Sequence, residues 1–178
     1  MIFGWFGKKT SNSAIVERQY ALLTEAGRQP SLYLGHDVPD TVMGRFEMLS
    51  AVFILYFRRT RHSGRAGQEI AQEIVDAFFE DIDHSIRELG VGDVSVPKRM
   101  KKLAGMFYGR LESYAAALDT GSAADLAASL RRNFYPEAGA SAPGMERLAA
   151  YLVRVEAALL AVPEDVVEAG RLAFPPAD

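Results

Sequence analysis

The residues that could hold a metal ion or activate a nucleophile are scattered along this sequence. Its three histidines, His36, His62 and His84, fall in three separate predicted segments, whereas zinc sites on helices use histidines one turn apart. There is no cysteine, which excludes thiol catalysis, disulfides and cysteine-held metal clusters. No pattern pairs a nucleophile with a base. We therefore expect no catalytic residue, no metal, no cofactor and no enzymatic activity.

The segment from Phe79 to His84 carries acidic side chains of the kind that bind Mg²⁺ in the aspartate-rich segments of isoprenoid enzymes. On a helix, however, Glu80 and Asp83 continue a stripe of outward carboxylates, while Asp81 projects in another direction. We therefore expect a solvated acidic face.

Two clusters of cationic side chains are denser than compensation of helix-end dipoles requires. The first consists of Arg58, Arg59, Arg61 and Arg65, and the second of Lys98, Arg99, Lys101 and Lys102. Such clusters either are solvated faces or bind phosphate groups, in RNA or in an anionic membrane. The formal net charge of −3 gives no global sign of nucleic-acid binding, and we expect no DNA partner.

Two glycines one helical turn apart, Gly105 and Gly109, lie on the predicted outward side of the helix that carries the second cluster. Glycine inside a helix costs about 1 kcal/mol relative to alanine, so its use at both positions suggests a notch for the backbone of another helix. That helix belongs either to this chain or to an apolar client. The stripe that would bind a client consists of Lys98, Lys102, Gly105, Gly109 and Glu112.

The first nine residues combine aromatic side chains with lysines, as at a membrane interface, although a frayed terminus is the alternative. The residues that would contact the membrane are Phe3, Trp5, Phe6, Lys8 and Lys9. They do not resemble a secretory signal, which has its lysines first and a long apolar region after them. The longest wholly apolar run, residues 51–57, is far shorter than the roughly 20 residues that a membrane span needs. We expect a cytoplasmic protein whose only membrane attachment would be peripheral, on the inner membrane.

The elements that position these residues are predicted to be helices throughout. Apolar residues recur at three- and four-residue steps, and no stretch alternates with a period of two, which indicates an all-α bundle of six to seven helices. The predicted helices cover about residues 13–27, 40–62, 66–89, 96–118, 122–134 and 145–159, and Pro163 opens a further short turn. We expect a flexible N-terminal segment (1–12), a single helical domain (13–174) and a tail (175–178).

Local signals mark several helix ends. Ser13 and Asp40 are predicted N-caps, Pro30 a stop followed by a loop over residues 31–39, and Gly90 the residue after a helix C-terminus. The predicted helix over residues 40–62 is apolar on every side around Phe53, so we expect the other helices to surround it.

Several stretches together resemble the ubiquinol-cytochrome c chaperone family. The longest resemblance runs over residues 83–93 and continues through 96–102 to Phe107, Tyr108, Gly109 and Arg110. Shorter ones lie at residues 37–41, 44–48 and 131–135, and the resemblance covers roughly residues 15–135. It implies a non-enzymatic, all-helical factor that handles newly made cytochrome b, or a similar apolar helical client, during assembly of the respiratory cytochrome bc complex. It also implies an accessory partner protein and the ribosome as contacts, since mitochondrial members act with both.

Two alternatives of other classes stay open. A helical bundle that binds an isoprenoid or quinone would need an enclosed apolar cavity, lined by Phe53, Tyr56, Phe78 and Phe107, that opens beside carboxylates. A ribosome-binding or RNA-binding module would show steep salt dependence through the cationic clusters.

Overall fold

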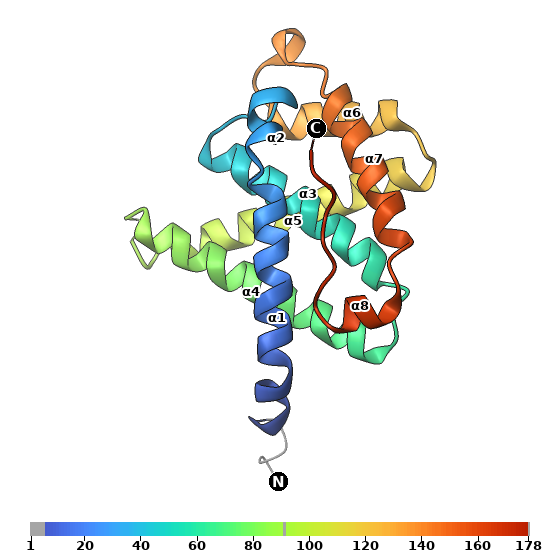
Figure 1. The fold of residues 1–178 in the computed structure, drawn as a ribbon. Coiled ribbons are helices and arrows are strands. Elements are labelled where there is room, and N and C mark those ends of the chain that lie inside the picture. Colours follow the sequence, from blue (N-terminus) through green and yellow to red (C-terminus); the bar gives the residue numbers. More distant parts are fainter. Residues whose placement is uncertain (1–5, 91, 178) are drawn as a thin grey trace.

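A computed structural model of the chain describes residues 6–90 and 92–177, with the backbone alone for residues 6–11. Within these ranges there are six long helices, two short ones, one 3₁₀ turn and no strand, so the predicted all-α domain is confirmed (Figure 1). The elements are α1 (Phe6–Gly27), α2 (Pro30–Gly35), α3 (Val42–Thr60), α4 (Arg65–Glu88), α5 (Val96–Asp119), α6 (Ala123–Phe134), η1 (Gly139–Ser141), α7 (Glu146–Leu160) and α8 (Glu164–Glu168).

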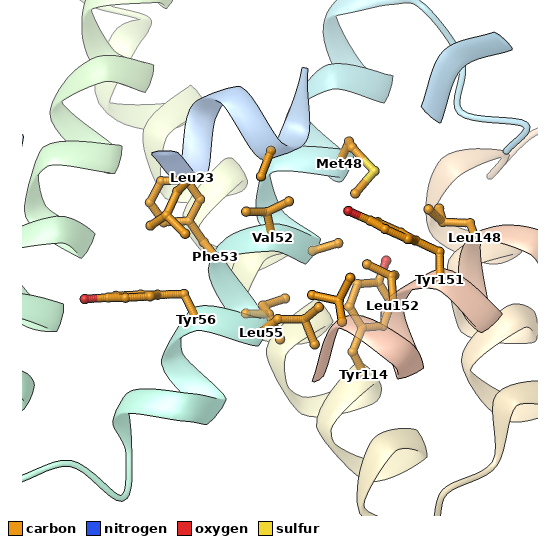
Figure 2. Packing of buried hydrophobic residues seen from close by; sticks show 14 of the residues in the cluster. Leu23, Met48, Val52, Phe53, Leu55, Tyr56, Tyr114, Leu148, Tyr151 and Leu152 are labelled. Atoms are coloured by element: carbon orange, nitrogen blue, oxygen red, sulfur yellow. The ribbon is translucent and has the colours of Figure 1, made fainter. Parts of the chain in front are cut away.

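Helix α3 is the centre of the domain, as its all-round hydrophobicity predicts. It packs against α1, α4, α5, α6 and α7. Figure 2 shows Leu23 of α1, Tyr114 of α5 and Tyr151 of α7 directed at this helix, where Phe53 has no exposed surface. The other long helices therefore pack around α3.

Helices α4 and α5 form a hairpin that projects from the rest of the domain. In Figure 1 the turn between them lies at the far left, away from α6, α7 and α8. Gly90 follows the end of α4 with φ +76°, a left-handed conformation that favours glycine, which confirms its prediction as a helix-terminating residue. Pro97 lies in the first turn of α5.

Two boundaries near the N-terminus differ from the predictions. Helix α1 begins at Phe6 and not at Ser13, since no proline interrupts the intervening residues. The segment expected to be a loop after Pro30 contains α2, because proline suits a first helical turn, where its missing N–H needs no partner.

The N-cap of α3 is Thr41 and not Asp40. The Thr41 hydroxyl accepts a hydrogen bond from the backbone N–H of Gly44 at 3.0 Å, whereas Asp40 pairs with Arg45. A Cβ at Gly44 would collide with the carbonyl of Pro39, so only glycine allows this close approach.

The residues after α8 run in extended form along α1 (Figure 1). The buried amide of Gln19 donates to the carbonyl of Leu172 at 2.8 Å and accepts from its N–H at 2.9 Å. Gln29 accepts from the N–H of Ala177 at 2.8 Å. These bonds tie α1 and the residue before α2 to the C-terminal segment.

Candidate functional site

The predicted client-binding residues share one exposed face of α5. All five, Lys98, Lys102, Gly105, Gly109 and Glu112, are exposed. Helices α3, α4 and α6 pack against the opposite side, where Phe107, Tyr114 and Leu118 are buried. A Cβ built on Gly105 or Gly109 meets no atom within 4 Å. The alternative in which another helix of this chain fills the notch is therefore wrong for the part of the chain that the structure describes.

A groove lies beside this face, between α4 and α5, and the sequence alone did not reveal it. Its apolar lining includes Phe57 of α3, Ala71 of α4 and Phe107 of α5, and its volume is about 300 Å³. Its polar lining includes Arg61, Gln68 and Gln72. Tyr108 stands on its rim, more than half exposed, next to Gly109. The signal in the sequence that could have indicated this groove is Tyr108, an aromatic residue that lies 100° around the helix from the buried Phe107, on the polar side.

The second cationic cluster lies on the surface. Lys98, Arg99, Lys101 and Lys102 are all exposed, and no ion pair joins any of them to another described residue. The charge on the first two turns of α5 is therefore available to a phosphate group outside the chain.

The first cationic cluster is not a surface patch at Arg58 and Arg59, and that part of the prediction is wrong. Arg58 is buried and pairs with Glu156 and, at 2.8 Å, with Asp119. The hydrogen bond from Arg58 holds the pKa of the Asp119 carboxyl below its ordinary value.

Arg59 is buried as well and donates to Glu164 at 3.0 Å. Arg61 and Arg65 remain exposed, with Arg65 paired to Glu69 at 2.8 Å. The two buried arginines bind carboxylates from α7 and α8, about a hundred positions along the chain, which spacing within the cluster could not indicate.

A buried ion pair sets the position of α5 against α3. Arg110, which directly follows Gly109, donates to both carboxylate oxygens of Glu47, at 2.7 and 3.0 Å. Glu47 is 2% exposed, and burial raises its carboxyl pKa above the ordinary value although the hydrogen bonds from Arg110 lower it. Because Arg110 is next to Gly109, this pair with α3 helps to hold α5 in the orientation that leaves both glycines at the surface.

The four side chains that would line the cavity of the isoprenoid alternative are packed together in the part of the chain that the structure describes. Phe53, Tyr56, Phe78 and Phe107 are buried, and the rings of Phe53 and Phe78 stack with centroids 4.4 Å apart. Phe107 fills the space beside Phe78, with centroids 5.6 Å apart. These four side chains pack against their neighbours and so favour the assembly-factor interpretation.

Within the acidic stretch of α4, Glu80 is exposed, as the predicted solvated face requires, whereas Asp81 and Asp83 make contacts within the chain. Asp81 accepts a hydrogen bond from the hydroxyl of Tyr20 at 2.9 Å, and Asp83 pairs with Arg87 at 2.7 Å. Among the described residues, no three acidic or histidine side chains gather as metal ligands would.

Part of the predicted membrane-interface set lies outside the described residues, namely Phe3 and Trp5. Phe6, Lys8 and Lys9 belong to α1, and the structure describes their backbone only. In the described part of the chain, no helix is both long and apolar enough to cross a membrane.

Comparison with known proteins gives three concordant similarities. The family described as "Ubiquinol-cytochrome C chaperone" matches residues 35–174. The Xenopus laevis protein named ubiquinol-cytochrome-c reductase complex assembly factor 1 is 26% identical over 119 residues, which are 65% of this chain and 58% of that protein. The chain thus spans little more than half of that relative. The crystal structure of the Cbp3 homolog from Brucella abortus is 44% identical, with a TM-score of 0.87, and the alignment covers 99% of this chain and 98% of that one.

Proposed function

Because the chain belongs to the ubiquinol-cytochrome c chaperone family, we propose that it is a non-enzymatic assembly factor that binds newly made cytochrome b. The client would be held as an apolar helix before it joins the respiratory cytochrome bc complex. The observation that carries this proposal is the open glycine face of α5 beside a groove whose lining includes Phe57, Phe107 and Leu111.

The geometry of that face suits a helix more than a small ligand. Without side chains at Gly105 and Gly109, a second backbone can approach α5 closely and gain van der Waals contact along a whole turn. A large aliphatic side chain of the same client helix can enter the neighbouring groove and cover Phe107 and Leu111. The exposed ring of Tyr108 lies between the two features and would contact the client in either one.

The location and further partners belong to the same proposal. A cytochrome b helix is available at the ribosome and at the bilayer, so we place the protein on the cytoplasmic side of the inner membrane, attached peripherally. An accessory partner protein and the ribosome remain predictions from the family.

Replacing both glycines by alanine tests the client face. We expect Gly105→Ala/Gly109→Ala to raise the free energy of unfolding by about 1 kcal/mol for each site, because the added methyl groups meet open space in a helix. The same methyl groups would hold a client helix away from α5 and reduce the cytochrome b that copurifies with the tagged chain from solubilised membranes. Stability and client recovery would thus change in opposite directions.

Gly35→Ala is the matched control, because its added Cβ also meets no atom within 4 Å but lies on α2. It should leave client recovery unchanged. A stabilised double variant that recovers as much cytochrome b as the wild type would contradict the notch. A wild-type chain that recovers no cytochrome b would contradict the choice of client.

A further inference from the structure

The turn between α4 and α5 exposes two aliphatic side chains at the outermost point of the hairpin. Leu89 is 64% exposed and Val94 is 96% exposed. Figure 1 places this turn well away from the body of the domain, and none of the other helices drawn there lies against it. Aliphatic side chains gathered at a projecting tip gain free energy if they enter an apolar phase.

The two sides of the hairpin carry opposite charge. The outward side of α4 is acidic and includes Asp76, Glu80 and Asp83. The side of α5 next to the tip is basic, and its exposed cations form no ion pair with a described residue. An anionic surface would therefore attract the α5 side and repel the α4 side, which defines one orientation of approach.

The acidic residue of the turn, Asp93, is ion-paired. Asp93 pairs with Arg87 at 2.6 Å, and Arg87 also pairs with Asp83 at 2.7 Å. No acidic residue stands between Val94 and Lys98 in the sequence, so the α5 side of the tip presents positive charge to an anionic surface. On the α4 side Glu88, which directly precedes Leu89, is exposed and pairs with His84 at 3.3 Å, so that side keeps its negative charge.

We propose that this tip is a membrane anchor for a bilayer that contains anionic lipid. Leu89 and Val94 insert between the headgroups, and Lys98, Lys101 and Lys102 bind the lipid phosphates. RNA would use the same lysines but would gain nothing from two aliphatic side chains ahead of them, and so the observations favour lipid. The anchor would bring the Gly105 and Gly109 face of α5 next to the bilayer, although the inference does not depend on the identity of the client.

A single environment-sensitive label tests insertion, because the chain has no cysteine of its own. We would introduce Val94→Cys, attach nitrobenzoxadiazole, and add vesicles of phosphatidylcholine with or without phosphatidylglycerol. The label should shift to the blue and brighten only with the anionic vesicles. A label at Leu160→Cys, an exposed position at the end of α7, is the matched control and should not respond.

Two variants separate the aliphatic from the electrostatic part, with vesicle cosedimentation as the measurement. Leu89→Ser/Val94→Ser should weaken binding roughly tenfold through lost apolar burial. Lys98→Glu/Lys101→Glu/Lys102→Glu should weaken it at least about a hundredfold, since each lysine near an anionic surface strengthens binding roughly fivefold. The charge-matched control reverses three exposed arginines away from the hairpin and should bind nearly as the wild type does: Arg147, Arg154 and Arg171.

Three results would overturn the anchor. The first is equal binding of the serine variant and the wild type to anionic vesicles. The second is binding of the wild type to purified ribosomes but not to vesicles, with a steep salt dependence, which would assign the lysines to RNA. The third is a shift of the Val94 label that depends on protein concentration without vesicles, which would make the tip a contact between two copies. Because none of these measurements uses cytochrome b, their failure is distinguishable from failure of the proposed function.

Discussion

Phe53→Ala is expected to lower the free energy of unfolding by about 3–5 kcal/mol, through lost burial and the cavity left behind. Phe53 is fully buried in α3, and its ring stacks on Phe78 of α4 and meets Tyr20 of α1, with centroids 5.6 Å apart, edge to face. Removing the ring would thus loosen the contacts of α3 with two neighbours at once. Chemical denaturation followed by circular dichroism measures the effect.

Tyr108→Ala provides the comparison for an aromatic side chain that lies at the surface. More than half of that ring is exposed, so its removal should change the free energy of unfolding by less than about 1 kcal/mol. Phe53→Leu should fall between the two, because it keeps most of the buried volume. If Phe53→Ala and Tyr108→Ala had the same effect, α3 would not be the centre of the core.

Arg110→Met is expected to cost a similar amount, about 3–5 kcal/mol near neutral pH, because it leaves the Glu47 carboxylate buried without its partner. Methionine keeps the length of the arginine stem, so the loss reports the charge more than the packing. Glu47→Leu/Arg110→Met, which removes both charges, should unfold within about 1 kcal/mol of the wild type, since apolar replacement of a buried ion pair is often neutral. If the double variant were as unstable as Arg110→Met, the loss of stability would come from packing and not from the unpaired charge.

The Arg110→Met variant also has a defined pH dependence. Burial already raises the pKa of Glu47 in the wild type, and loss of Arg110 removes the interactions that lower it, so this pKa rises further in the variant. A carboxyl whose pKa is higher in the folded state than in the unfolded state binds its proton on folding. The penalty is therefore full above the folded-state pKa and decreases as the pH falls through it, towards the unfolded value of about 4.3. Denaturation at neutral and at mildly acidic pH should show the difference between variant and wild type shrinking at the lower pH.

The parts of the fold that the sequence predicted are those set by residues a few positions apart. The period of apolar residues and the capping side chain of Ser122 predicted helices whose observed bounds agree closely, as for α6. The start of α3 was misplaced by one residue, because Asp40 and Thr41 are both good caps and only Thr41 reaches the N–H of Gly44. The sequence did not predict α2, because a proline can follow the end of one helix or occupy the first turn of the next. Pro30 was interpreted as an end, whereas it opens α2.

The candidate site also has a part that one helix determines and a part that the packing of several helices determines. The face that carries Gly105 and Gly109 follows from the angles around one helix, and those angles are a property of α5 alone. Whether that face was covered depended on where the other helices pack, and the structure leaves it open. The groove below Tyr108 is formed where α3, α4 and α5 come together, so no single helix sequence contains it.

The sequence by itself determined the six long helices of the described chain, because hydrophobic period, caps and glycine costs act over a few residues. It could not assign the charges, because Arg58 and Arg61 are three positions apart and identical in type. Only the tertiary structure decided that Arg58 is buried against Glu156 while Arg61 is exposed. It likewise decided that Glu47 meets Arg110, 63 positions further along the chain. The partner and the burial of a charge depend on which distant segment lies opposite it, and this contact is formed only when the helices pack.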